Sequence, residues 1–559
     1  MVDNYFIADQ FSMLSKLMDI HGENSFKARS YGAAAFTIEK LPEQINTMPR
    51  EKLASIKGIG ESAAKKIIEI LDTGKLLALE EIVSKTPPGV IEMLSIKGLG
   101  PKKIATIWKE MQLESIGELL YACNENRLLL YKGFGEKTQK NVQESIEFYL
   151  QNQGSFLYAE IEALFPSVSG YLEKVFGADK VSVTGACRRQ ELTIDELEFI
   201  INQPRETVRK AFQTAFPPEL LEENEKMLFY KLKNGLKLRL HTDASAFTRQ
   251  LFVSTGSNDF VEAFLKKYPD ASFSGNEEDV FRSVKLPYLP PFVRESDNLD
   301  AVVATASTDD LVQVTDIKGI IHSHSNWSDG ANTIEEMAKA CIEQKLEYLV
   351  ISDHSKAAAY AGGLSEEKIK EQHAYIDELN NRFAPFKIFK SIECDILGDG
   401  SMDYSDSILS TFDLVIASVH SNLKMTQDKA MMRLLKAIAN PYTTILGHMT
   451  GRLLLSRGGY PVDHELIIEA CAAHHVVIEL NAHPRRLDID WRWIQPAVDK
   501  GVMISIDPDA HHVDGYKDCK YGVLAAQKAG LSKANNLSSF GLRVFEQFLQ
   551  KTRSLKKIG

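Results

Sequence analysis

The sequence lacks any continuous run of about 18 apolar residues, the length that a membrane-spanning helix needs. Its first residues, MVDNYFIADQF, contain neither the basic segment nor the apolar segment of a signal peptide. The six cysteines are scattered, and no two have the Cys-x-x-Cys spacing of a zinc or redox motif. We therefore expect a cytoplasmic protein with free thiols and no association with a membrane.

Positive charge is also in short supply. The chain has 65 Lys and Arg against 76 Asp and Glu, and its net charge of −11 argues against a broad nucleic-acid surface. The first 150 residues are nearly neutral, with 19 basic and 20 acidic residues, so any contact with nucleic acid must be local. Histidine is scarce before residue 322, with two of 14, whereas twelve lie between 322 and 512. This asymmetry predicts a histidine-rich site in the second half of the chain.

The overall composition is that of a soluble globular protein, with 44% hydrophobic and 25% charged residues. A chain of 559 residues exceeds what one hydrophobic core serves, so several domains are expected. We expect a multidomain α and α/β protein that is monomeric. The predicted divisions are a helical domain at 1–150, an α/β domain at 151–296, a linker at 297–313 and an α/β barrel at 314–559.

Three short segments in the helical domain repeat one pattern: LASIKGIGESAAKKI (53–67), LSIKGLGPKKIATI (94–107) and LYKGFGEKTQKNV (130–142). Each has an apolar helix end, a Lys-Gly-x-Gly turn and a new helix with basic residues. The glycines allow a sharp turn, and the following helix N-terminus attracts an anion such as a DNA phosphate. One copy alone would favour a plain helical hairpin, but three copies favour DNA binding. The predicted contact residues are Gly58, Gly60, Gly98, Gly100, Lys102, Lys103, Gly133 and Gly135.

These repeats resemble helix-hairpin-helix motifs, which grip the DNA backbone independently of sequence. The stretch ENSFKARSYGAAAFTIEKLP (23–42), together with the first hairpin and DTGKL (72–76), resembles the N-terminal domain of X-family DNA polymerases. In some members of that family this domain is a 5′-deoxyribose-phosphate lyase that uses a Schiff-base lysine. The resemblance implies that Lys66 is at the position of this lysine. The simpler interpretation of Lys66 is a solvated helix lysine.

The middle region contains TGACRRQELTIDELEFII (184–201), which predicts a glycine turn, an arginine pair and a strand with Glu196 and Glu198 on one face. Paired carboxylates beside a basic turn are typical of two-metal phosphoryl transfer. With TGS (255–257) and LPYLPPFVRES (286–296), the region resembles the catalytic region of X-family DNA polymerases. The resemblance implies binding of Mg²⁺ and an incoming dNTP. The implied positions are Gly185, Arg188, Arg189, Glu196, Glu198, Arg239, Gly256 and Ser257.

The catalytic positions depart from the family pattern. Ala186 replaces the turn serine, a Glu pair replaces the family's Asp pair, and Arg239 aligns with the third Asp. Each Glu extends its carboxylate by roughly 1.5 Å, and a misplacement of about 1 Å can cost on the order of 100-fold in rate. An arginine also puts positive charge where a cation must bind. We expect a weakened or lost Mg²⁺ site and polymerase activity, with Asp243 as an alternative third ligand.

In the last 250 residues, apolar strands repeatedly end in His, Asp or Glu. The stretch IIHSHSNWSDG (320–330) places His322 and His324 on one side of a strand end, followed by Asp329. In a parallel barrel the carboxyl ends of the strands converge, and such a set of ligands suits Zn²⁺, Mn²⁺ or Fe²⁺. One such residue alone would favour a loop histidine or a helix cap, but the series favours a metal centre. The further predicted ligands are His354, Glu393, His420, His448, Asp509 and His511.

This order of residues resembles the PHP (polymerase and histidinol phosphatase) family over about 314–540. The resemblance implies a distorted seven-stranded barrel with a trinuclear metal site. The implied ligand sets are His322, His324 and Asp509 for one ion, His420 and His448 for the second, Glu393 bridging both, and Asp329, His354 and His511 for the third. Arg452 is the candidate phosphate clamp, and His483, Arg485 and Arg486 are weaker candidates at the rim.

The hairpins, the polymerase-like region and the PHP-like barrel, in this order, resemble bacterial X-family DNA polymerases. The resemblance implies a repair protein that binds gapped DNA or 3′ ends and hydrolyses phosphoester bonds in the 3′–5′ direction, with a weakened polymerase region. One alternative is an active gap-filling polymerase with a 3′–5′ exonuclease. Another is a small-molecule phosphatase such as a histidinol phosphatase, which leaves the three hairpins without a role.

Overall fold

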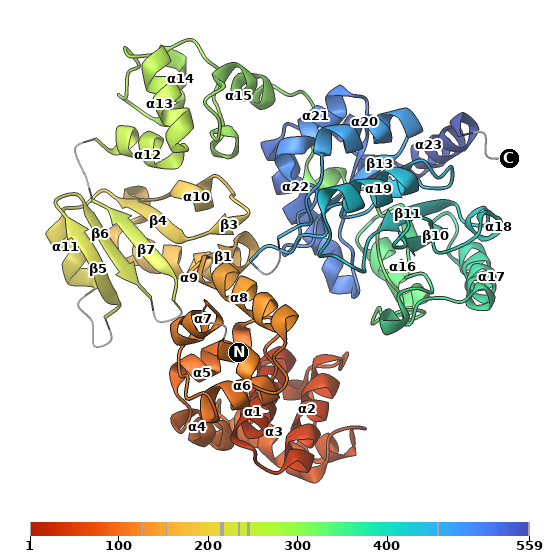
Figure 1. The fold of residues 1–559 in the computed structure, drawn as a ribbon. Coiled ribbons are helices and arrows are strands. Elements are labelled where there is room, and N and C mark those ends of the chain that lie inside the picture. The colour runs from red at the N-terminus through yellow and green to blue at the C-terminus, as the bar shows by residue number, and fades with distance from the viewer. Residues whose placement is uncertain are drawn as a thin grey trace. The chain divides into compact units, whose positions relative to one another are not determined.

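The computed structural model describes residues 2–124, 127–151, 154–212, 217–232, 235–242, 246–455 and 458–556. The chain forms two compact units, Met1–Gln153 and Gly154–Gly559, and Figure 1 traces both in chain order. Among the described residues, no helix has the length and apolar character needed to cross a membrane.

The first unit is entirely helical, as predicted. Its helices are α1 (Asn4–His21), α2 (Ser25–Glu39), α3 (Glu61–Thr73), α4 (Leu77–Ser84), α5 (Pro88–Glu92), α6 (Pro101–Lys109), α7 (Ile116–Asn124) and α8 (Glu136–Gln151). The side chain of Asp3 caps the start of α1, and Gly22 ends it with a left-handed φ of 74°. Apolar residues at helical spacing in α1, such as Ile7, Phe11 and Leu14, are buried in one continuous core.

Each Lys-Gly-x-Gly segment forms the same turn. A short 3-10 helix precedes it: Arg50–Ser55, Met93–Ser95 or Arg127–Leu130. The first glycine then takes a left-handed φ of 96° at Gly58, 87° at Gly98 and 96° at Gly133, a conformation that favours glycine. The second glycine immediately precedes α3, α6 or α8. Three helical hairpins of the predicted kind are therefore present.

The second unit begins with a mixed five-stranded sheet in the order β2-β4-β7-β6-β5. Its strands are β2 (Val181–Thr184), β4 (Glu196–Ile201), β5 (Glu219–Asn224), β6 (Met227–Lys231) and β7 (Lys237–His241). Strands β4 and β7 are parallel neighbours, which brings Glu198 beside Arg239 in the register. Leu197 and Phe199 of β4 are buried in the core beneath α9 (Tyr158–Phe176). The alternation leaves Glu196 and Glu198 on the opposite face, as predicted.

Four helices follow this sheet: α12 (Phe247–Thr255), α13 (Asn258–Lys267), α14 (Glu277–Ser283) and α15 (Leu299–Ala306). Phe252, Phe264 and Phe281 pack against one another at their centre. The segment predicted as a linker, 297–313, contains α15, whose Leu299 and Val302 join the same cluster. This part of the chain therefore packs onto the preceding helices.

The rest of the unit is a parallel sheet of seven strands whose spatial order follows the chain, from β8 to β14. The strands are β8 (Gly319–Ile320), β9 (Tyr348–Ile351), β10 (Lys387–Asp395), β11 (Leu414–Ser418), β12 (Ile445–Leu446), β13 (Val477–Asn481) and β14 (Ile504–Asp507). A parallel bridge between Ser323 and Ala510 joins the segments that follow β8 and β14. The sheet thus closes almost completely, and the predicted distorted seven-stranded barrel is confirmed.

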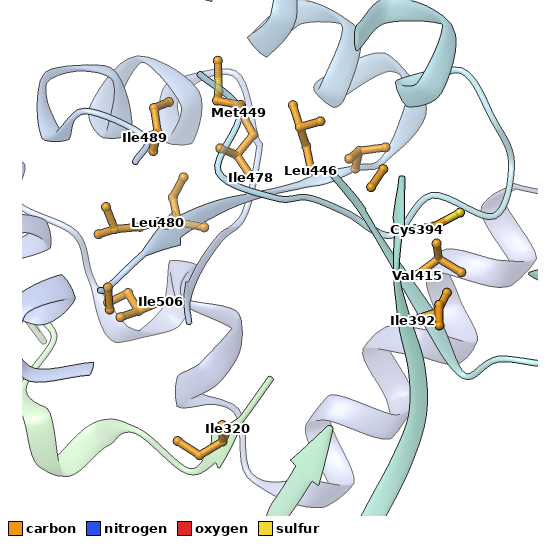
Figure 2. Packing of buried hydrophobic residues seen from close by; sticks show 14 of the residues in the cluster. Ile320, Ile392, Cys394, Val415, Leu446, Met449, Ile478, Leu480, Ile489 and Ile506 are labelled. Atoms are coloured by element: carbon orange, nitrogen blue, oxygen red, sulfur yellow. The ribbon is translucent and has the colours of Figure 1, made fainter. Parts of the chain in front are cut away.

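The two faces of the barrel strands pack against different partners. Ile392 and Cys394 of β10 and Ile478 and Leu480 of β13 belong to a cluster shared with the surrounding helices (Figure 2). These helices are α16 (Ile334–Glu343), α17 (Glu366–Phe383), α19 (Gln427–Ile438), α20 (His464–His474) and α22 (Cys519–Lys528). The last helix of the chain is α23 (Leu542–Leu555). The opposite strand faces form a second cluster, in which Val477 joins Phe545 of α23. Because α16, α17, α19, α20 and α22 all pack on the first cluster, as helices do on the outside of such a barrel, the second cluster lies on the inner face, where α23 packs against it.

Candidate metal centre

The predicted metal ligands stand at the carboxyl ends of the barrel strands. His322 and His324 directly follow β8, and Glu393 lies near the end of β10. The others are His354 after β9, His420 after β11, His448 after β12, Asp509 and His511 after β14, and Asp329 in the loop after β8. Parallel strands end at one edge of the barrel, so ligands from distant parts of the sequence meet there.

Ligand atoms lie within 4.8 Å of one another in three groups: His322, His324 and Asp509; His324, Asp329, His354 and His511; and His354, Glu393 and His420. The first group has the composition of one predicted set, and the second adds His324 to another. His448 is next to the third group, with its Nε2 2.9 Å from Oε1 of Glu393. All nine side chains thus belong to one connected cluster.

Glu393 is the centre of this cluster and is fully buried. Its Oε1 is 3.1 Å from Nε2 of His420 and 3.5 Å from Nε2 of His322. Its Oε2 is 2.9 Å from Nδ1 of His354 and 3.6 Å from Nε2 of His324. One carboxylate surrounded by imidazoles on both oxygens has the geometry that a bridging ligand requires.

The electrostatics of the cluster favour a cation. Burial opposes ionisation of Glu393, yet His420 and His322 hold the pKa of its carboxyl well below the ordinary value. Burial also lowers the pKa of His420, but Glu393 and Asp395 outweigh it and raise that pKa to about 10. For His324, burial and the neighbouring ring of His511 lower the pKa to about 3. Glu393 is therefore ionised beside the rings of His420 and His322, whereas the His324 ring is neutral.

Five buried atoms of the predicted ligands have no hydrogen-bond partner among the described residues: Nε2 of His322, Oε2 of Glu393, and the Nδ1 atoms of His324, His354 and His448. A buried polar atom without a partner is costly, and in native proteins it calls for a specific explanation. Imidazole nitrogens and carboxylate oxygens together suit Zn²⁺, Mn²⁺ or Fe²⁺. The residues present therefore fit divalent metal ions.

Several residues that sequence reasoning did not single out support these ligands. Glu479 accepts hydrogen bonds from the His322 ring and the His448 backbone. Oδ1 of Asp395 is 3.1 Å from Nδ1 of His420, and Asn481 donates to Asp509. The signal that could have found Glu479 and Asn481 is the alternation of β13, where polar residues replace apolar ones on one face towards the strand end.

The basic candidates near the cluster differ in what they contact. Arg452 donates from Nε to the backbone oxygen of Arg486 at 3.0 Å and pairs with Asp490 at 2.8 Å. It also donates to the backbone oxygen of Leu487. Arg486 instead points its own Nε towards Oδ2 of Asp509, at 3.6 Å. The role of Arg452 as a phosphate clamp stays a prediction, and Arg486 lies beside the predicted ligands.

The carboxylates predicted for the polymerase-like site are paired with an arginine and a histidine. Arg239 donates to both oxygens of Glu196, at 2.8 and 2.9 Å. Nε2 of His241 is 3.0 Å from Oε2 of Glu198. Gly185, with a left-handed φ of 67°, leaves no room for a side chain, because a Cβ there would lie 1.9 Å from Oε1 of Glu198. Asp243, the alternative third ligand, lies outside the described residues.

The remaining nucleotide-site candidates contact neighbouring side chains of the same region. Arg188 donates to Oγ1 of Thr255 at 2.7 Å and pairs with Glu277 at 2.5 Å. Arg189 donates to both oxygens of Glu295, each at 3.1 Å. Ser257 caps the start of α13. A Cβ at Gly256 would lie 2.8 Å from the Phe260 ring, so this glycine permits close packing. The predicted residues are thus brought together in one region.

The lyase candidate Lys66 lies on α3 beside an open pocket lined by Glu61, Ser62, Lys65 and Glu69. Its Nζ is 6.0 Å from the centre of the Tyr31 ring. In the second hairpin, Lys102 and Lys103 lie in the first turn of α6, and Lys103 donates to the backbone oxygen of Gly98 at 3.1 Å.

Three family models match the chain: a helix-hairpin-helix domain at residues 2–76, a SAM-like helix-hairpin-helix tandem at 90–147 and a PHP domain at 321–483. A Bacillus subtilis (strain 168) protein named DNA polymerase/3′-5′ exonuclease PolX is 31% identical over 563 residues, covering 96% of this chain and 97% of that protein. A probable phosphatase of Thermoanaerobacter sp. (strain X514) is 26% identical over 201 residues, covering 34% of this chain and 77% of that protein.

Proposed function

The chain belongs to the PolX family, the bacterial X-family DNA polymerases with a PHP domain, and from that membership we propose that its barrel hydrolyses phosphoester bonds at DNA ends. The proposed direction is 3′ to 5′, and the proposed substrates are gapped duplexes and 3′ ends. The observation that carries the proposal is the gathering of nine ligand-type side chains, the buried Glu393 among them, in one connected cluster. Hairpins that bind DNA backbones would supply the substrate.

The three groups of ligand atoms and His448 would hold the divalent ions, with Glu393 shared between sites. Divalent ions in such a site activate water and neutralise charge on phosphate oxygens. The chain itself contributes fixed geometry, because Glu479 and Asp395 orient two of the imidazoles. We propose that Arg486, which lies beside Asp509, positions a phosphate oxygen. Arg452 donates to the backbone oxygen of Arg486 and would hold that residue in place.

We also propose that the polymerase-like site is weakened. The guanidinium of Arg239 is bound to both oxygens of Glu196, which are the atoms with which Glu196 would bind Mg²⁺. Arginine does not release its proton in proteins, so it cannot give way by deprotonation. The pairing of Glu198 with His241 further reduces the carboxylate available to a metal.

Gap-filling synthesis is the second candidate activity, because the Bacillus subtilis relative is named a DNA polymerase as well as an exonuclease. Under this alternative, Glu196 and Glu198 would bind Mg²⁺ once a nucleotide displaces Arg239 and His241 from them. A phosphatase acting on small molecules is a third possibility, favoured by the similarity of 34% of the chain to a probable phosphatase.

One assay separates these activities. The purified protein is incubated with Mn²⁺ and an end-labelled gapped duplex, with and without dNTPs, beside His324→Ala. His324 contributes to two of the three ligand groups, so stepwise shortening of the strand should disappear in this variant. His474→Ala, at an exposed histidine on α20, is the matched control and should retain the shortening.

Primer extension at full rate in both proteins would contradict the weakened polymerase site. Absence of any action on DNA, together with turnover of a small phosphomonoester, would favour the third possibility over hydrolysis at DNA ends.

A further inference from the structure

Glu479 lies on the inner face of the barrel, in contact with two of the predicted metal ligands. Side chains two apart on a strand share a face, so Val477 and Glu479 of β13 point to the same side. Val477 belongs to the inner hydrophobic cluster, whereas Ile478 and Leu480 pack outwards with the helices. Glu479 is completely buried. A fully buried carboxylate is rare unless it is paired, so its contacts are informative.

Both oxygens of Glu479 hold segments that carry predicted ligands. Oε1 is 2.5 Å from Nδ1 of His322, and Oε2 accepts from the backbone N–H of His448 at 2.6 Å. These ligands follow β8 and β12, two strands that are not neighbours in the sheet. A third contact, from Nδ2 of Asn481 at 3.4 Å, is longer. One side chain of β13 therefore ties two ligand-bearing ends of the barrel together.

The contact with Nδ1 also decides which nitrogen of His322 is free. A carboxylate beside Nδ1 keeps the proton on that atom and leaves the lone pair of Nε2 for another partner. Nε2 is 3.5 Å from Glu393 and 3.6 Å from Asp509, and it has no hydrogen-bond partner among the residues that the structure describes. The free lone pair therefore faces the cluster, as a metal-binding nitrogen must.

We propose that Glu479 is a positioning residue for the metal centre: it sets the orientation and tautomer of His322 and fixes the backbone of His448. This inference rests on the proposed metal-dependent function. Glu479 itself does not contact the ion or the substrate. A carboxylate hydrogen-bonded to a metal-binding imidazole makes the imidazole a stronger metal ligand. Replacing such a carboxylate typically lowers metal affinity by about 10- to 100-fold.

The test compares Glu479→Gln, which keeps the shape and removes the charge, with Glu479→Ala, which removes both. Mn²⁺ affinity and the number of bound ions are measured by calorimetry and elemental analysis on protein stripped of metal. We expect Glu479→Gln to weaken binding of one ion by about 10- to 100-fold and Glu479→Ala to weaken it further. The visible absorption of bound Co²⁺, which reports ligand geometry, should change in both variants.

The control is Glu469→Gln, at an exposed carboxylate on α20 that pairs with Lys500, and it should bind metal like the parent. The melting temperature of stripped Glu479→Gln should stay near that of the stripped parent, which separates metal positioning from a purely structural role. Should Glu479→Ala fail to fold, Glu479→Gln alone carries the test.

Unchanged affinity, stoichiometry and Co²⁺ absorption in Glu479→Gln would overturn the inference while leaving the metal centre intact. A parent protein that binds no divalent ion would overturn the proposed function and, with it, this inference.

Discussion

Whether a carboxylate of this chain can bind a metal ion depends on the basic side chains that already contact it. Glu393 is surrounded by imidazoles, which can lose a proton and become metal ligands. Glu196 is bound by a guanidinium, which stays charged. The two glutamates therefore differ in the chemistry open to them, and the difference lies in the type of side chain that contacts each carboxylate.

The first prediction concerns Glu196→Ala. Glu196 and Arg239 are both partly exposed, and pairs of this kind contribute about 0–1 kcal/mol to stability. We expect the variant to fold and to hydrolyse DNA ends at nearly the rate of the parent, measured by the end-labelled duplex assay. A large loss of hydrolysis would contradict an inert polymerase-like site.

The second prediction concerns acid sensitivity at His373 of α17, whose ring packs edge-on against Phe412 with centroids 4.9 Å apart. Burial, with a smaller effect of Lys390, lowers the pKa of His373 to about 4. The unfolded value is about 6.5. The neutral ring therefore contributes fully above about pH 6.5, and this contribution is lost as the pH falls towards 4.

We expect the free energy of unfolding of His373→Phe, measured in urea, to fall less than that of the parent between about pH 7 and pH 4.5. His474→Phe changes an exposed histidine and should follow the parent. Parallel curves for the parent and His373→Phe would contradict the assignment.

At the scale of elements, the three hairpins share one construction. The first glycine of each turn has a left-handed φ, and no side-chain cap is present at the start of α3 or α6. The first N–H groups of these helices are thereby left without intrahelical partners and favour an external anion. The same element repeated three times offers several phosphate contacts from a nearly neutral unit.

The third prediction uses the turn glycines Gly98 and Gly133, around which a Cβ would meet no atom within 4 Å. Alanine there adds only backbone strain, about 1–2 kcal/mol per position. We expect the double variant Gly98→Ala, Gly133→Ala to bind duplex DNA about tenfold more weakly, measured by fluorescence anisotropy at fixed salt.

Gly117→Ala is the control, since Gly117 lies in α7 with open space around its Cα and no left-handed φ. It should bind DNA like the parent. Equal affinity in the double variant and the control would argue against the hairpins as the DNA-binding elements.

At the scale of the whole molecule, the second unit joins the mixed sheet to the barrel through buried charge. Lys528 of α22 has no exposed side-chain surface and is 2.7 Å from Glu295 and 3.4 Å from Glu191. It also donates to the backbone oxygen of Arg189 at 2.8 Å. A barrel helix thus holds the turn after β2 and the segment after α14 in one ionic network.

The fourth prediction is that Lys528→Met destabilises the second unit. Glu191 and Glu295, which are partly buried, then keep only Arg189 as a cationic partner among the described residues. Breaking a fully buried pair from one side costs about 3–5 kcal/mol, so we expect a smaller loss of about 1–3 kcal/mol here. Urea unfolding measures the change. Lys517→Met, at a side chain 73% exposed, should be nearly neutral, and equal stability of the two variants would contradict the network.

The local, periodic features were predictable from the sequence alone. Apolar runs that end in His, Asp or Glu identify strand ends, and the repeated Lys-Gly-x-Gly segments identify the hairpins, because both patterns reflect backbone geometry over a few residues. The helical first unit, the mixed sheet and the seven-stranded barrel followed from these patterns together with the family resemblance. The contacts of Arg452 and Arg486 did not, because both residues follow strand ends and differ only in where their guanidinium groups point.

Only the tertiary structure decided the partners. Glu479 meets His322 across 157 positions of the chain, Glu196 meets Arg239 across 43, and Lys528 meets Glu295 across 233. Such pairings depend on strand register and side-chain direction, to which no local sequence period corresponds. The sequence by itself determined which residue types gather at the barrel mouth, and the packing of the strands determined which of them touch.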